Sequence, residues 1–222
     1  MKSAILLFIR EFLSEIVAGK LFFKSIDLKE RNTIIILKNY FIEKKMILMM
    51  GEYDQIGKLC ARVVAGKSSF LVDRPPLHLL NDTLTYIGFD LKGAMTGAKS
   101  ILGKKKKCPI IVNPYLGISL FPNKSPQKVD CIWFNPEHII KTTAMGNETK
   151  VELSNGYSIR VDSKSSTFND KIQTAKHLIR LSMERGNHPG PVTFYLEPKE
   201  GRQLSKEKTG KYNFSSLEDE QK

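Results

Sequence analysis

The sequence predicts an α+β protein in which an antiparallel β-sheet or meander follows a basic helical segment and precedes a long C-terminal amphipathic helix. Three observations predict this class. Short β-branched or aromatic runs separated by Pro, Gly or Asn fill residues 109–161, which is typical of strands joined by tight turns. Two shorter helical stretches precede these runs, and apolar residues at helical spacing follow them.

The chain divides into three regions by composition. Residues 1–39 are expected to form an N-terminal extension, residues 40–198 a single domain, and residues 199–222 a disordered tail. Within the extension, residues 4–17 are amphipathic. They form a helix that binds a membrane surface or a partner, a helix that packs on the rest of the protein, or upstream sequence translated from a mis-called start. We prefer the last alternative, with initiation near Leu37. In the sequence, no apolar run approaches the roughly 18–20 residues of a membrane span.

The first half of the domain combines strands with two helices. Residues 46–50 form an apolar run that Gly51 is expected to end, and residues 59–64 are typical of a strand. Two prolines open a helix over residues 75–88, and a second helix covers residues 90–102. A helix-turn-helix is one interpretation of this pair. Glycines in the second helix weaken it, so we prefer two packed helices followed by a basic loop.

The second half predicts strands and then a helix. The expected strands cover residues 109–112, 116–121, 131–134 and 138–142, and an Asn155-Gly156 hairpin joins residues 149–153 to 157–161. This pair accepts φ > 0 at both turn positions. A long helix follows, capped by one of residues 165–167 and ended by Gly186. Its outer face is expected to be basic and to carry Lys171, Lys176, Arg180 and Arg185.

The charge of the chain is unusually positive. It carries 35 Lys and Arg against 23 Asp and Glu, a formal net charge of +12, although the apolar fraction of 41% and charged fraction of 26% are those of an ordinary globular protein. These fractions exclude wholesale disorder, collagen and coiled coil. Such a basic chain attracts nucleic acid, anionic membrane or acidic proteins.

One segment accounts for the excess charge of the domain. No Asp or Glu lies between Asp90 and Asp130, and we call this segment the acid-free window. Four consecutive lysines alone are equally typical of a solvated loop, but a carboxylate-free segment of this length is what a surface facing phosphates requires. The candidate DNA-binding residues are therefore its lysines: Lys92, Lys99, Lys104, Lys105, Lys106, Lys107, Lys124 and Lys128.

The sequence shows no catalytic, cofactor or metal motif. It has no glycine-rich phosphate loop, His-Glu-x-x-His, Gly-x-Ser-x-Gly or Cys-x-x-Cys, and its three cysteines and four histidines are scattered. We expect no enzyme activity, no cofactor, and a reducing cytosol as the compartment. His138 is interpreted as a satisfied core histidine, and Trp133, Phe134 and Phe121 as core residues instead of a base-stacking platform.

Several stretches resemble the ComK family of competence transcription factors. The resemblance rests on Asn113-Pro114, Ile118-Ser119-Leu120-Phe121-Pro122, Ile132-Trp133-Phe134-Asn135-Pro136-Glu137-His138-Ile139, the Asn155-Gly156 hairpin, and the helix start at Ser165, Phe168 and Ile172. Upstream, Tyr40-Phe41-Ile42-Glu43 and Gly57-Lys58-Leu59-Cys60 are similar to the opening strands of the family. The resemblance covers roughly residues 40–200.

The resemblance implies a DNA-binding activator of DNA-uptake genes. Family members act as homo-oligomers on paired A/T-rich boxes of double-stranded DNA, which implies a cytoplasmic, nucleoid-associated protein. Lysines near a narrow A/T minor groove meet enhanced negative potential, so recognition can rest on DNA shape. The candidate lysines come from charge and are not carried over from the family.

The end of the domain resembles a segment that hands family members to a proteolytic adaptor. The matching residues are Phe194, Tyr195, Leu196, Pro198 and Lys199, with Glu197 standing where the family pattern has an aromatic residue. Two alternatives to the activator stay open. An RNA-binding module would require exposed aromatics beside the lysines, and a protein-interaction domain would use the lysine loop on an acidic partner.

Overall fold

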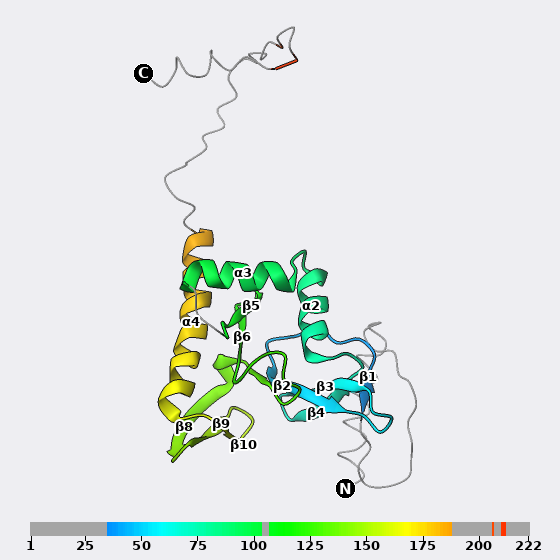
Figure 1. Ribbon diagram of the computed structural model, residues 1–222, viewed down its shortest axis with the longest axis vertical. Helices are drawn as coiled ribbons and strands as arrows, with labels where there is room; N and C mark the ends of the chain where they lie inside the picture. The colour runs from blue at the N-terminus through cyan, green and yellow to red at the C-terminus, as the bar shows by residue number, and fades with distance from the viewer. Residues whose placement is uncertain (1–34, 104–106, 188–205, 207–209, 212–222) are drawn as a thin grey trace, which may run out of the picture. The chain divides into compact units, whose positions relative to one another are not determined.

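The computed structural model describes residues 35–103 and 107–187, together with residues 206, 210 and 211 (Figure 1). Seven strands form one sheet in the order β1-β4-β3-β2-β7-β6-β5, antiparallel throughout except for the parallel pair of β1 and β4. In this order the strands are Ile36–Leu37, Ser68–Val72, Leu59–Ala65, Met46–Tyr53, Ile132–Phe134, Ile118–Pro122 and Ile110–Asn113.

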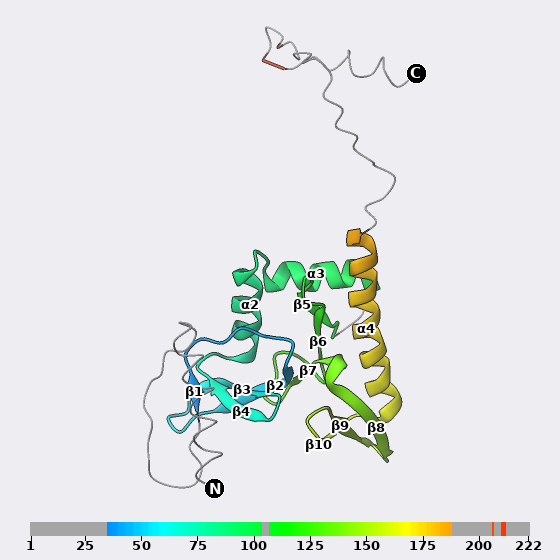
Figure 2. The same ribbon diagram turned by 180° about the vertical axis from the view of Figure 1, so that it is seen from behind.

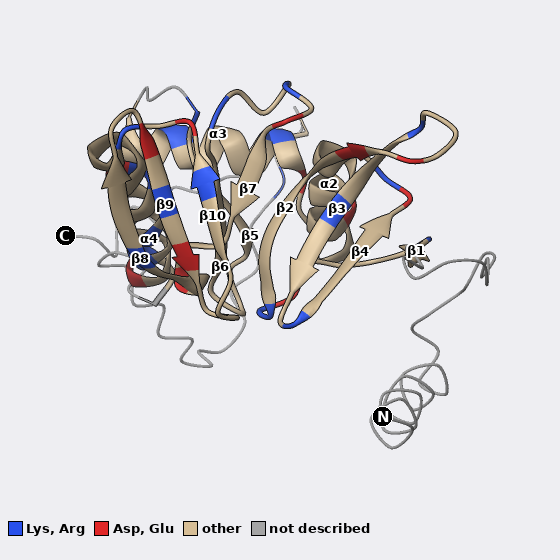
Figure 3. Ribbon diagram, turned by 90° about the horizontal axis from the view of Figure 1, so that it is seen from below, with Lys and Arg blue, Asp and Glu red and all other residues tan. Residues whose placement is uncertain are grey.

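A smaller antiparallel sheet contains three strands in the order β10-β9-β8. They are Ser158–Val161, Glu148–Leu153 and Ile139–Met145, and a 3-10 turn, η1 (Pro136–His138), leads into β8. Figure 3 shows this sheet beside the large one, seen from below. The α+β class predicted from the sequence is confirmed.

Three helices complete the described fold: α2 (Pro76–Tyr86), α3 (Leu91–Leu102) and α4 (Ser165–Asn187). Pro76 stands at the start of α2, where the missing backbone N–H costs no helical hydrogen bond. Figures 1 and 2 show α3 lying across one end of the fold, from α2 to α4. No helix in the described ranges is both long and apolar enough to cross a membrane.

Two apolar cores hold these layers together. The first packs α2 against the large sheet, with Leu79 and Leu80 beside Met49, Val63 and Trp133, all of them 1% exposed or less. Leu91 and Met95 of α3 pack against the same core. The lysine-bearing helix is therefore fixed to the sheet through its apolar side.

The second core joins α4 to both sheets. Phe168 of α4 meets Phe121 and Phe134 edge-to-face, with ring centroids 5.5 and 5.4 Å apart, and all three side chains are fully buried. Val151 and Val161 of the small sheet belong to the same cluster. Trp133, Phe134 and Phe121 are thus core residues, as predicted.

Several element predictions were wrong in detail. The run after Met46 continues through Gly51 to Tyr53, because these residues pair with Leu59–Ala61 of β3. A Cβ at Gly51 would lie 2.6 Å from the Val129 carbonyl oxygen, so the close packing there requires glycine. Residues 40–43 form a loop and not a strand. Strand β4 was missed because its first half, Ser68 and Ser69, is polar.

The predicted Asn-Gly hairpin is present, but its turn differs from the expected type. Leu153 N donates to Tyr157 O at 2.8 Å, which leaves a three-residue loop. Only Gly156 has positive φ (+87°), as in the common type I turn with a G1 bulge. Asn155 instead accepts from Tyr157 N and donates to Gly66 O at 3.0 Å, so the loop is tied to the β3–β4 turn.

Candidate nucleic-acid interface

Helix α3 carries two of the candidate lysines on a well-defined backbone. The Asp90 carboxylate caps the helix, since its Oδ1 accepts from Gly93 N at 2.8 Å. Gly103 ends the helix with φ +78°, a conformation that favours glycine. The start and the end of this helix are therefore both fixed by local chemistry, and the lysines between them have set positions.

Lys92 and Lys99 lie on the exposed side of α3. Its other side is held by Leu91, Met95 and Ala98, of which Ala98 is only 3% exposed. Among the described residues no carboxylate forms an ion pair with either lysine. Their positive charge is available to an anionic partner.

The helix surface between the two lysines carries only small side chains, and we call it the low face of α3. Thr96 and Ser100 are small, and a Cβ added at Gly97 would meet no atom within 4 Å. Packing within the chain therefore does not require glycine here, although a mid-helix glycine costs about 1 kcal/mol relative to alanine. A low surface of this kind lets a partner's backbone approach the helix closely.

The lysine run after α3 lies mostly outside the described residues. Lys104, Lys105 and Lys106 are not described, and Lys107 is exposed with φ +57°. Burial, and next the charge of Lys107, lower the pKa of Lys171 on α4. Lys107 is thus within electrostatic reach of α4.

The last two lysines of the acid-free window face carboxylates. Lys124 Nζ lies 2.7 Å from Asp130 Oδ2 and 3.9 Å from Asp162 Oδ2. The hydrogen bond to Asp130 raises the pKa of Lys124 and lowers the pKa of Asp130, and the charge of Lys128 lowers the Asp130 pKa further. The window lacks acids in sequence but not in space. Among the described residues, Lys124 forms ion pairs, whereas Lys92, Lys99 and Lys128 form none.

Helix α4 is less basic on its outer face than predicted. The assignment of Lys171 to that face was wrong: its side chain is half-buried, and Nζ donates to the Asn123 carbonyl oxygen. Lys176 lies 3.8 Å from a Glu137 carboxylate oxygen. Arg180 is likewise 3.8 Å from the carboxylate of Glu184, while Arg185 is exposed.

His138 is satisfied, as predicted, but as a half-buried link and not inside a strand. Its Nε2 lies 2.6 Å from the Lys44 carbonyl oxygen and its Nδ1 lies 2.7 Å from Ser154 Oγ. The Asn135 side chain accepts from Glu137 N and holds the 3-10 turn that delays the strand. The imidazole therefore ties the segment before β2 to the small sheet.

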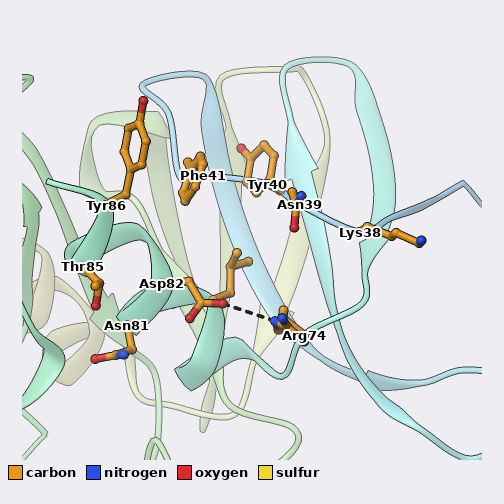
Figure 4. Close-up of a pocket in the computed structure, with 10 residues that line it drawn as sticks. Lys38, Asn39, Tyr40, Phe41, Arg74, Asn81, Asp82, Thr85 and Tyr86 are labelled. Carbon is orange, nitrogen blue, oxygen red and sulfur yellow. Dashed lines mark hydrogen bonds and ion pairs between the residues drawn. The ribbon is translucent and has the colours of Figure 1, made fainter. Parts of the chain in front are cut away.

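Sequence reasoning missed an exposed aromatic pair. Phe41 and Tyr86 stack with ring centroids 4.3 Å apart, in a hollow that Tyr40 and Lys38 also line (Figure 4). Burial, and next the charge of Glu43, raise the pKa of the Tyr40 phenol. The sequence analysis placed Phe41 in a strand, whereas the structure places it in a loop that exposes its ring to solvent.

The candidate adaptor segment, residues 194–199, lies outside the described residues, as does most of the predicted tail. The same holds for the predicted helix over residues 4–17.

The described geometry is that of an α+β domain with a capped helix that presents Lys92 and Lys99 to solvent. The model of the ComK protein family matches residues 37–187, and the chain belongs to that family. A competence transcription factor of Bacillus subtilis (strain 168) is 26% identical over 170 residues, covering 75% of this chain and 88% of the relative. No solved structure matches the chain.

Proposed function

We propose that the protein is a competence transcription factor that binds double-stranded DNA at paired A/T-rich boxes as a homo-oligomer. Membership of the ComK family and the competence transcription factor of Bacillus subtilis support the class. The observation that carries DNA binding is the unpaired charge of Lys92 and Lys99 on a rigid, low helix face. The protein acts at the nucleoid in the cytoplasm.

The lysine spacing suits contact with separate phosphates. Lys92 and Lys99 are seven residues apart, which is about 10 Å along a helix at 1.5 Å per residue. Each ammonium that neutralises a phosphate releases condensed counterions and gains affinity without regard to sequence. Helix α3 contains no Arg, Asn or Gln, the side chains that most often read base edges. Phosphate contact is therefore its main role.

Preference for A/T-rich boxes then comes from DNA shape. A/T tracts have a narrow minor groove with enhanced negative potential, which attracts lysines placed at its rim. The undescribed Lys104, Lys105 and Lys106 follow directly after α3 and supply further positive charge next to it. The spacing between boxes is read by two or more protomers together.

Fluorescence anisotropy tests this function on the full chain. Duplexes that carry paired A/T-rich boxes are compared with shuffled G/C-rich duplexes of equal length across a salt series. We expect tighter binding to the boxes at physiological salt, with two or more protomers per box pair by sedimentation. Equal affinity for every duplex would overturn the proposal, and binding that survives nuclease treatment of an extract would favour an acidic protein partner instead.

Regulated degradation is a further part of the proposal. Residues 194–199 are similar to the adaptor-recognition segment of the family. The half-life of the protein should lengthen in adaptor-deficient cells, and an unchanged half-life would remove this element.

A further inference from the structure

Two open hollows beside α2 and α3 share Asn81 in their lining. The first, of about 480 Å³, is lined by the aromatic pair and by Lys38, Asn39 and Arg74 (Figure 4). The second, of about 540 Å³, continues along α3 past Leu91 and Thr96 to Lys99. Because Asn81 lines both, the aromatic hollow and the lysine hollow are neighbours, and we call the two together the Asn81 groove.

The aromatic end presents a ring face to solvent. Phe41 is 40% and Tyr86 71% exposed, and their planes differ by only 22°, so the two rings form a flat stack. Tyr86 is the last residue of α2, and Phe41 lies in the loop before β2. A flat exposed aromatic stack is the kind of platform on which an unpaired nucleobase stacks.

The groove is positive overall. It contains four cations, Lys38, Arg74, Lys92 and Lys99, against the carboxylates of Asp82 and Asp90. Asp82 Oδ2 lies 3.3 Å from Arg74 Nε, and Asp90 caps α3 through Gly93 N. Both carboxylates are therefore already engaged, and the three lysines stay free for phosphates.

A polar group in the floor of the groove is half-satisfied. Asn81 Oδ1 accepts from Leu91 N at 3.1 Å, which orients the amide. Its NH₂ group donates no hydrogen bond to any described residue. An amide donor between a stacking platform and a row of lysines matches the acceptors that base edges present.

We propose that the Asn81 groove binds single-stranded DNA, with one base stacked on the Phe41–Tyr86 pair and the backbone following Lys38, Lys92 and Lys99. The cation excess favours a polyanion over an apolar peptide. Lys92 and Lys99 also belong to the proposed duplex surface, so a strand unpaired from an A/T-rich duplex continues directly into the groove. The inference goes beyond the proposed function because the aromatic end has no role in duplex binding.

Anisotropy of a labelled 15-nucleotide oligo(dT) with the full chain tests the platform. Tyr86→Ala and Phe41→Ala should each weaken binding about 5- to 150-fold, the range measured when a stacking aromatic is removed. The matched control is Tyr115→Ala, a tyrosine that is 78% exposed in the β5–β6 turn. It should leave oligo(dT) affinity within twofold, and all three variants should keep wild-type affinity for the A/T-box duplex.

A second variant reports stacking directly and does not depend on loss of binding. Tyr86→Trp keeps a stacking ring and adds an exposed fluorophore to a chain whose single Trp, Trp133, is 1% exposed. Oligo(dT) should quench the new emission, whereas the A/T-box duplex should not. Circular dichroism and thermal melting confirm that each variant folds.

Three outcomes would overturn the inference: oligo(dT) affinity unaffected by Tyr86→Ala and Phe41→Ala, an equal loss in Tyr115→Ala, or no quenching of Tyr86→Trp. Oligo(U) binding tenfold tighter than oligo(dT), with the same dependence on Tyr86, would assign the groove to RNA and also overturn it. Loss of box preference in the wild-type duplex assay, with the oligo(dT) results intact, would refute only the proposed function.

Discussion

Removing the two free lysines of α3 should lower both the affinity for duplex DNA and its salt dependence. Lys92 and Lys99 are exposed, form no ion pair with a described carboxylate, and sit on a helix whose inner side is packed on the core. Lys92→Ala/Lys99→Ala should therefore leave the fold intact. The change removes two phosphate contacts, because each ammonium stands clear of the protein.

The size of the effect follows from counterion release. The slope of log K against log salt is about −0.9 per phosphate contact, so the slope of the double variant should be shallower by about 1.8. If those contacts contribute nothing at 1 M salt, the double variant should bind the duplex about 30-fold more weakly than wild type at 0.15 M salt and about 200-fold more weakly at 0.05 M. The deficit should grow steadily as salt is lowered.

The control removes the same charge elsewhere. Lys67→Ala/Lys141→Ala also deletes two exposed lysines, one in the β3–β4 turn and one on β8, elements that lie at the opposite end of the fold from α3 (Figure 1). Anisotropy over 0.05–0.3 M salt should show a much smaller change of slope for this variant. Equal slopes for the two double variants would refute the placement of DNA on α3, since only net charge would then matter.

Four further changes test the structural account. Phe168→Ala should lower the free energy of unfolding by about 3–5 kcal/mol in a urea titration, because it empties the aromatic core, and a loss below 1 kcal/mol would contradict that core. The hydrogen bond from Arg62 holds the pKa of Glu52 below its usual value. The wild type should therefore be more stable than Glu52→Gln above about pH 4.5, and this advantage should vanish as the pH falls through the folded-state pKa of Glu52. Gly156→Ala should cost about 1 kcal/mol because its φ is +87°, without any contact change, and an unchanged melting midpoint would refute this. Gly97→Ala should raise the melting midpoint through helix propensity yet weaken duplex binding, and unchanged binding would show that the low helix face has no function.

Local patterns in the sequence predicted the elements whose chemistry is local. The prolines that open α2 and the end of α3 before Gly103 follow from rules that need only neighbouring residues. The Asn-Gly hairpin was found for the same reason. Its turn type was wrong because Asn155 bonds to Gly66, a residue 89 positions away.

Long-range pairing decided what sequence patterns could not. Gly51 ends an apolar run in sequence but stays in β2 because it pairs with Ala61 of β3 and its N–H donates to the Val129 carbonyl oxygen. Strand β4 exists through pairing with β3 on one side and β1 on the other, despite its polar start. Such strands have no local signature, since their partners supply the stabilisation.

That the lysines of the acid-free window bind DNA stays a prediction, and the fold brings carboxylates to one end of this window. A lack of nearby carboxylates in the sequence does not exclude carboxylates brought in by the fold, and Asp162 reaches Lys124 from beyond β10. Lys92 and Lys99 form no ion pair with a described carboxylate, since they lie on the exposed side of α3. The Phe41–Tyr86 pair could not be predicted from the sequence, because only the packing of the loop on α2 brings the two residues together.

Lysine footprinting tests the central claim most directly. The full chain is acetylated with and without the A/T-box duplex, and each lysine is quantified by mass spectrometry. The account predicts protection of Lys92, Lys99 and the undescribed Lys104–Lys106, with Lys67 and Lys141 labelled equally in both states. Protection of Lys67 and Lys141 with α3 left unprotected would place the DNA on another face and contradict the account.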